Sequence, residues 1–139
     1  MPEGPEVKRM AYKLSRLITN KNLLKINILS GRYKVHEPPK NYTTFLSSLP
    51  TKVIKVFVKG KFIYVLFKNG FYMWNTLGMT GKWSAKKNKH SHVEFIFKNK
   101  KIYFNDMRNF GTLHFSFNPE SIKHKLTIIG PDILEFDTN

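Results

Sequence analysis

The fold is indicated by residues 53–77, which read VIKVFVKGKFIYVLFKNGFYMWNTL. Apolar side chains recur at alternate positions through this stretch, and Gly60 and Gly70 interrupt it. Short period-two runs bounded by glycine or asparagine predict antiparallel strands joined by tight turns. We therefore expect seven successive strands, at 53–58, 61–67, 71–77, 82–84, 92–97, 101–105 and 112–117, with hairpin turns at 68–70 and 98–100 and a kink or bulge at 59–60.

The flanks of this region add helices. Apolar residues at helical spacing from Val7 to Ile18 predict an amphipathic helix over 5–19, with Pro5 in its first turn. We also expect a strand at 23–29, a loop at 31–41, short helices at 42–48 and 119–127, and a turn at 129–132. With no repeat or linker, residues 1–139 are predicted to form one domain of the mainly β (α+β) class. Its expected architecture is a two-layer antiparallel β-sandwich of about eight strands, with an N-terminal helix and a further short helix. The seven strands from 53 to 117 are expected to follow one another as a meander.

Composition excludes several classes of protein. The 139 residues include 20 aromatic side chains, enough to build a core, and no cysteine. A disulfide framework and a cysteine-ligated zinc or iron–sulfur site are therefore excluded, and we predict no cofactor or metal in this chain. The longest apolar run, Phe62 to Phe67, is too short to span a bilayer, and the acidic N-terminus does not resemble a signal peptide. We expect an intracellular protein with no membrane partner.

The charge points to a polyanionic partner. The formal net charge is +15, and the basic residues are spread along the whole chain, so a folded surface carries the positive field. A polyphosphate is the partner class that this field favours. The alternative is that abundant Lys and Asn reflect an AT-rich coding bias and only aid solubility, which explains Lys over Arg but not the shortage of acids.

The first residues, Met1-Pro2-Glu3, offer a nucleophile. Removal of Met1 leaves Pro2 with a free secondary amine, and an α-amine has a pKa near 8, so part of it is unprotonated at neutral pH. Attack on an aldehyde carbon would give an iminium, which is an electron sink for elimination. The alternative is that Met-Pro is a common start without chemical meaning and that Glu3 only caps the following helix.

Six short motifs carry a resemblance. In order they are MPEGPEV at 1–7, KGK at 59–61, LGMTG at 77–81, HSHVE at 90–94, DMRNFG at 106–111 and GPD at 130–132. Together they resemble the formamidopyrimidine-DNA glycosylase/endonuclease VIII family of base-excision repair enzymes, over essentially the whole chain. The resemblance implies a bifunctional DNA glycosylase and AP lyase that removes oxidised bases through a Schiff base and then eliminates the flanking phosphates by β- and δ-elimination.

The resemblance also implies roles for seven residues. Pro2 would be the nucleophile, Glu3 the general acid at the sugar ring oxygen, and Lys61 would contact phosphate and position the sugar. The void left by the flipped nucleotide would be filled by two apolar wedges and a hydrogen-bonding cation, and a histidine would contact phosphate. These DNA-binding residues are Met79, Arg108, Phe110 and His90. Without the resemblance, Met79 and Phe110 would be interpreted as core side chains and Arg108 as a solvated cation. Lys61 would be an ordinary charge at a sheet edge.

The paired histidines at 90 and 92 are expected to share a strand face, but two histidines without a third ligand make a poor zinc site. His92 is expected in the core or on the sheet surface. The motifs also depart from the family pattern at Thr76, Met107 and Asn109, where the family has a histidine, a proline and a second arginine. Gly4 is similar to the endonuclease VIII branch, whereas the presence of all three void-filling residues, Met79, Arg108 and Phe110, is similar to the formamidopyrimidine branch. The lesion preference therefore stays open.

Length is the largest departure. Family members carry a second domain with a helix-two-turn-helix motif and usually a zinc finger, so 1–139 corresponds to the N-terminal catalytic domain, either as a fragment or as a minimal form that needs a partner chain. A zinc ion would belong only to that second domain. The expected partner is damaged double- or single-stranded DNA, bound by a monomer. Two other functions are open: a tautomerase-like enzyme using an N-terminal proline as base, and a non-catalytic nucleic-acid-binding module.

Overall fold

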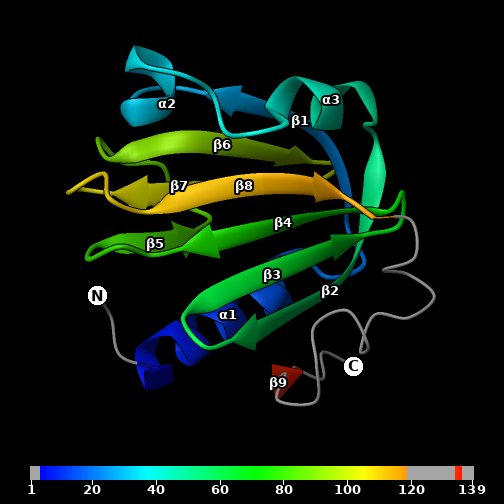
Figure 1. The fold of residues 1–139 in the computed structure, drawn as a ribbon, viewed down its shortest axis with the longest axis horizontal. Helices are drawn as coiled ribbons and strands as arrows, with labels where there is room; N and C mark the ends of the chain where they lie inside the picture. The colour runs from blue at the N-terminus through cyan, green and yellow to red at the C-terminus, as the bar shows by residue number, and fades with distance from the viewer. Residues whose placement is uncertain (1–3, 119–133, 136–139) are drawn as a thin grey trace.

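The computed structural model describes residues 4–118 and 134–135. Pro2, Glu3 and the predicted helix and turn at 119–127 and 129–132 lie outside this part. Figure 1 shows the arrangement. The helices are α1 (Gly4–Ile18), α2 (Arg32–Val35) and α3 (Tyr42–Ser47). The strands are β1 (Asn22–Ile28), β2 (Thr51–Lys59), β3 (Phe62–Phe67), β4 (Phe71–Thr76), β5 (Gly81–Ser84), β6 (Ser91–Phe97), β7 (Lys101–Asp106), β8 (Thr112–Phe117) and β9 (Leu134–Glu135).

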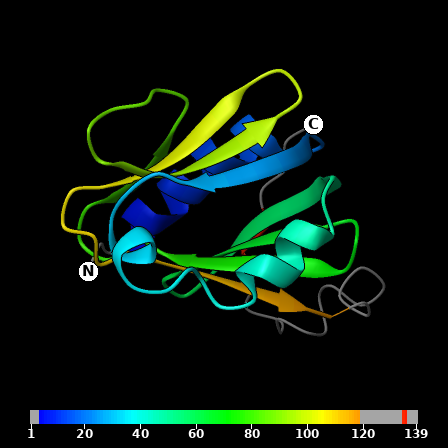
Figure 2. The same ribbon diagram turned by 90° about the horizontal axis from the view of Figure 1, so that it is seen from above.

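The strands form one continuous antiparallel path, β5-β7-β6-β1-β2-β3-β4-β8, with β9 paired to β2. This path folds into two layers, as the turned view in Figure 2 shows, with β5, β7, β6 and β1 in one layer and β2, β3, β4 and β8 in the other. The layers join where Asn22 and Leu23 of β1 pair with Lys52 and Thr51 of β2. The predicted sandwich is confirmed.

The meander order is wrong for three pairs of successive strands, β4/β5, β5/β6 and β7/β8. Instead, β4 pairs with β8, β5 with β7, and β6 with β1 as well as β7. The chain crosses from one layer to the other between β4 and β5, and crosses back between β7 and β8. Because β4 pairs with β8 and β5 with β7, the two crossover loops, residues 77–80 and 107–111, run side by side. Both lie at the end of the sandwich where α1 begins (Figure 1).

The core fills the space between the layers and under α1. The buried face of α1 presents Val7, Ala11, Leu14 and Ile18, at most 5% exposed, at the spacing predicted from sequence. Burial of each such aliphatic side chain larger than alanine stabilises the fold by about 1.5–3 kcal/mol. The helix packs against β2, β3 and β5. Its first turn is therefore fixed relative to the strand ends around it.

The other side of the core is aromatic. Phe45 of α3 is fully buried and stacks on Phe115 with ring centroids 4.5 Å apart, and it also contacts Phe67 and Phe71. The predicted short helix at 42–48 is thus confirmed as the element that closes this side. In contrast, α2 lies in the predicted loop at 31–41, where only one helical turn forms and none of its residues is buried.

The kink predicted at 59–60 is a hairpin instead. Lys59 pairs with Phe62, which leaves Gly60 and Lys61 as a two-residue loop between β2 and β3. Gly60 has φ +60°, the sign that a type II′ turn requires at its first central position. Lys61 therefore sits at the tip of a turn and is exposed, rather than opening a strand.

A buried carboxylate ties β1, β6 and β7 together. Asn27 donates a 2.9 Å hydrogen bond from Nδ2 to Glu94 Oε1, and the Tyr103 hydroxyl donates to Oε2 at 3.1 Å. The Asn27 bond is the main reason that the pKa of Glu94 lies below its ordinary 4.5, although burial acts in the opposite direction and the Tyr103 bond adds a smaller lowering. The charged form of Glu94 is therefore part of the folded state.

We expect Glu94→Gln to lower the free energy of unfolding at neutral pH by about 1–3 kcal/mol, because one buried donor loses its charged acceptor. The wild-type protein should also lose stability as the pH falls from about 4.5 through the lower folded pKa, since the unfolded chain takes up the proton first, and this component should be missing in the variant. Urea unfolding at several pH values measures both effects. The exposed Glu37→Gln is the control with the same charge change; equal behaviour of the two variants would contradict the role given to Glu94.

Candidate functional site

The two crossover loops touch through a glycine. Gly78 has φ +60°, and a Cβ placed on it would lie 2.7 Å from both the Gly111 nitrogen and the Phe110 carbonyl carbon. A side chain at this position would be both strained and blocked by backbone, so the close contact of the loops requires glycine. The LGMTG motif, through Gly78, and the DMRNFG motif are therefore parts of one surface.

A buried carboxylate fixes both loops. Asp106, at the end of β7, is 1% exposed and accepts hydrogen bonds from the Thr80 hydroxyl at 2.6 Å and the Gly111 amide at 2.7 Å. The Thr80 oxygen in turn accepts the Arg108 amide at 2.8 Å. Hydrogen bonds to a charged acceptor are the stronger ones in proteins. Asp106 and Thr80 thus hold the backbone on both sides of Arg108.

Two further contacts complete the base of the loops. The His92 Nε2 atom lies 2.7 Å from the Asp106 carbonyl oxygen, which can only accept, so Nε2 carries a proton and donates it, and Nδ1 is hydrogen-bonded to the Ser30 hydroxyl at 2.8 Å. Thr76 and Thr112 share a 2.7 Å hydrogen bond between their hydroxyls where β4 ends and β8 begins. Thr76, a departure from the family pattern, therefore joins the two strands that lead into the loops.

We expect Asp106→Asn to destabilise the loops. The amide is similar in size but offers only one acceptor oxygen, so either Thr80 or Gly111 loses its partner, at a cost of about 1.5–3 kcal/mol in the free energy of unfolding. Chemical denaturation measures the loss. Thr80→Ser keeps the hydroxyl and is the control that should stay near wild type. Wild-type stability of Asp106→Asn would contradict this account of the loops.

The loop tips carry the predicted void-filling trio. Met79 is 55% and Phe110 56% exposed, and the Arg108 guanidinium carbon lies 5.8 Å from the centroid of the Phe110 ring. All three side chains are therefore on the surface and not in the core, as their turn positions predict. Met107, which sequence reasoning treats only as a replaced proline, is 60% exposed in the same loop. Three large apolar side chains thus stand in water on the two loops, one of them beside Arg108, an arrangement that serves contact with a partner.

Asn109, where the family pattern has a second arginine, adopts φ +61° in this loop. Asparagine tolerates the left-handed region better than most residues, so the substitution suits the backbone between Arg108 and Phe110. A Cβ on Gly31, just before α2, would lie 3.0 Å from the Asn109 Oδ1 atom. The loop is therefore packed against the start of α2 on this side.

The remaining predicted site residues are distributed at the same end. Lys61 lies at the tip of the β2–β3 hairpin, and α1 begins at Gly4 at this end of the sandwich (Figure 1). His90 lies in the turn before β6, and its carbonyl oxygen accepts the Asp106 amide at 3.0 Å. Pro2 and Glu3 lie outside the described residues, directly before the first turn of α1.

The two histidines do not share a strand face, because His90 precedes β6 and only His92 lies in it. His92 is the residue that sequence reasoning missed, since its role depends on Ser30 and Asp106, which lie far from it in the sequence. Within residues 4–118, no group of three or more His, Asp or Glu side chains is arranged to hold a metal ion. None of the helices in the described part of the chain is long and apolar enough to cross a membrane.

Comparison with known proteins identifies the fold and its family. Residues 1–113 match the family model described as the formamidopyrimidine-DNA glycosylase N-terminal domain. The chain belongs to this family. It is 34% identical to the formamidopyrimidine-DNA glycosylase of Lactobacillus gasseri over 121 residues, covering 82% of this chain and 42% of that protein. With the enzyme of Oceanobacillus iheyensis the identity is 33%, over 100% of this chain and 51% of the relative.

Solved structures of formamidopyrimidine-DNA glycosylases have the same fold. The MutM (Fpg) protein of Thermus thermophilus superposes with a TM-score of 0.70 at 22% identity, over 94% of this chain and 46% of that one. A MutM structure in complex with DNA that contains carbocyclic 8-oxo-G gives a TM-score of 0.73 at 21% identity, over 91% and 48% of the two chains. The chain thus spans about half the length of the formamidopyrimidine-DNA glycosylases that it matches.

Proposed function

We propose that this chain carries the catalytic half of a base-excision DNA repair enzyme, a bifunctional DNA glycosylase and AP lyase for oxidised bases. The observation that carries the proposal is one juxtaposition: the helix that follows Pro2 and Glu3 begins at the end of the sandwich where Met79, Arg108 and Phe110 are exposed. Family membership and the net charge of +15 support it. The partner is damaged DNA, double- or single-stranded, bound by a monomer inside the cell.

The proposed chemistry starts at the N-terminal amine. The Pro2 nitrogen attacks C1′ of the damaged nucleotide and gives up its N–H proton, and the base leaves with the bonding electrons of the glycosidic bond and takes up a proton. Protonation of the ring oxygen by Glu3 opens the sugar, and the nitrogen lone pair forms the C=N⁺ bond of an iminium. Loss of a C2′ proton then expels the 3′ phosphate by β-elimination, and a second elimination expels the 5′ phosphate. These steps use only side chains and the terminal amine, so the proposal includes no cofactor.

The loops supply the groups that extrusion of a nucleotide requires. A flipped nucleotide leaves an unstacked gap at a cost of a few kcal/mol, and apolar side chains that enter the gap offset that cost. Met79 and Phe110 are exposed side chains of this kind, and Arg108 beside Phe110 can donate hydrogen bonds to the orphaned base. Lys61 and His90 are proposed to contact the phosphates beside the lesion.

The exposed loops and the proline amine together distinguish the proposed function from its two alternatives. A tautomerase-like enzyme needs the proline amine but gives no use to an exposed Met-Arg-Phe cluster. A non-catalytic nucleic-acid-binding module uses the cluster and the charge but not the amine. Strand cleavage of an oligonucleotide with a single abasic site tests all three, because only the proposed lyase both binds DNA and cuts it at the site.

We expect Glu3→Gln to separate the two activities. The variant should lose at least about a hundredfold in excision of an oxidised base, the typical contribution of a general acid. It should lose less in cleavage of a preformed abasic site, because that sugar is already partly open. Gel assays on matched duplexes with an oxidised guanine or an abasic site measure the two rates. Equal losses on both substrates would mean that Glu3 is only a cap for α1.

A further inference from the structure

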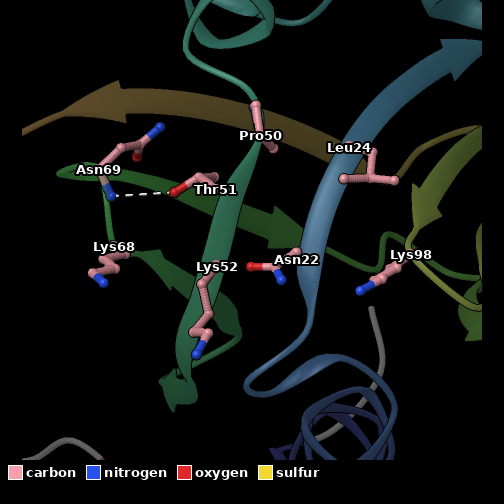
Figure 3. Close-up of a pocket in the computed structure, with 8 residues that line it drawn as sticks. All are labelled: Asn22, Leu24, Pro50, Thr51, Lys52, Lys68, Asn69 and Lys98. Atoms are coloured by element: carbon pink, nitrogen blue, oxygen red, sulfur yellow. Dashed lines mark hydrogen bonds between the residues drawn. The ribbon is translucent and has the colours of Figure 1, made fainter.

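The end of the sandwich opposite the loops holds a groove of about 490 Å³ (Figure 3). Three lysines line it, Lys52 at the start of β2, Lys68 in the β3–β4 turn and Lys98 in the β6–β7 turn. The two turns are the Lys-Asn hairpins that the sequence predicts, one from each layer of the sandwich. Neither turn has a part in the proposed repair chemistry.

The strand register sets the lysines in a row. Lys68 donates its backbone amide to the Lys52 carbonyl oxygen at 2.8 Å, and Lys52 pairs with Asn22 of β1. Leu23 pairs with Phe97, so Lys98 follows on the other side of Asn22. The order across the groove is therefore Lys68, Lys52, Asn22, Lys98. With neighbouring strands about 4.8 Å apart, the row is about 15 Å long.

The row carries positive charge without a counter-charge. No Asp or Glu is among the residues that line the groove. Within residues 4–118, none of the three ammonium groups has an ion-pair or hydrogen-bond partner. Cations at such spacing repel one another, and a bound polyanion would remove that repulsion. The groove is thus suited to an anion that extends along the row.

We propose that this groove binds the phosphodiester backbone of a nucleic-acid strand, as a second site separate from the loops. Phosphates follow one another every 3.4 Å along a strand of duplex DNA, so a row of about 15 Å spans several of them. Leu24, 44% exposed, and Pro50 form an apolar wall beside the lysines, which can contact sugars or an unstacked base. Flexible lysines on a groove wall bind backbone without reading sequence.

The site goes beyond the proposed repair activity. The turns and strand ends that line it lie at the opposite end of the sandwich from the two crossover loops (Figure 1), so a strand in the groove is not the stretch of DNA that those loops contact. A protein with two such sites can hold one segment of nucleic acid while it engages another. The groove binds without sequence or lesion preference.

The test compares two triple variants of the 139-residue chain with the same change in charge. One replaces Lys52, Lys68 and Lys98 by Gln, and the control replaces the exposed Lys25, Lys82 and Lys86 by Gln. Fluorescence anisotropy follows binding of a short undamaged oligothymidylate from about 50 to 200 mM salt. Each lost phosphate contact lowers the slope of log K against log salt by about 0.7, so the groove variant should lose about 2 in slope and at least tenfold in affinity at low salt.

The control variant should keep its slope close to wild type. Equal losses in both variants, or no loss in the groove variant, would overturn the proposal in favour of a general surface field. Tighter groove-dependent binding of a polyglutamate peptide than of the oligonucleotide would overturn it in favour of an acidic protein partner. Borohydride trapping on abasic DNA should be unchanged in the groove variant, so failure of this site and failure of the repair activity give different results. Thermal unfolding of each variant confirms that it is folded.

Discussion

Insertion of one alanine between Met1 and Pro2 should abolish covalent trapping of the protein on abasic DNA. After removal of Met1 the chain would begin with alanine, and the Pro2 nitrogen would be an amide whose lone pair is delocalised into the carbonyl. An amide nitrogen cannot form the iminium, and the new alanine amine is displaced by one residue from the position of the Pro2 nitrogen. We expect a loss of at least about a thousandfold in trapping and in strand cleavage, as is typical when a covalent nucleophile is removed.

Two controls make this result specific. Pro2→Gly keeps an α-amine at the same position and should retain part of the trapping, whereas the insertion should retain none above background. Thermal unfolding should be the same for the wild type and both variants, because the buried face of α1 begins only at Val7. Trapping of the insertion variant at the wild-type rate would show that the nucleophile is elsewhere.

Phe110→Ala should weaken action on duplex DNA far more than action on unpaired DNA. The exposed Phe110 ring, beside Arg108, is proposed to enter the gap that the flipped nucleotide leaves, and without it the unstacking cost of a few kcal/mol is no longer offset. A loss of about 2–3 kcal/mol corresponds to roughly 30- to 150-fold in the rate on a duplex. A single-stranded oligonucleotide has no stacked duplex to open, so its cleavage should change much less.

Phe117→Ala is a matched control. Phe117 is 58% exposed, close to the 56% of Phe110, but it lies at the opposite end of β8. Its removal should leave the ratio of duplex to single-strand cleavage unchanged. The ratio is measured on the same abasic oligonucleotide with and without its complement. Similar ratios for the two variants would mean that the Phe110 ring does not act in the gap.

The elements of the fold are largely predictable from local pattern. The apolar spacing from Val7 to Ile18 predicts α1, and period-two runs predict β2 to β8 to within a few residues. The pairing of β4 with β8 and of β5 with β7 is not predictable in this way, because each pair joins segments separated by a layer crossing or by another strand. The meander expectation fails at these pairs for that reason.

The candidate site is also predictable only in part, in its exposed residues but not in the contacts that support them. Met79, Arg108 and Phe110 are recognisable from short motifs at turn positions, and the structure brings the two motifs into contact at Gly78. The support beneath them is not visible in the sequence. Asp106 and His92 look like an ordinary strand-end acid and a strand histidine until Thr80, Gly111 and Ser30 are placed against them. Partners so distant in sequence are set by tertiary packing and not by local propensity.

The most direct test of the account is to map the adduct that borohydride leaves between the wild-type chain and an abasic oligonucleotide. Reduction fixes only an imine or iminium, so the linked residue is the nucleophile. Peptide mass spectrometry should place the adduct on the N-terminal peptide that begins at Pro2, with Met1 absent. An adduct on Lys61 or another internal lysine, or a protein that retains Met1 and still traps, would contradict the proposal.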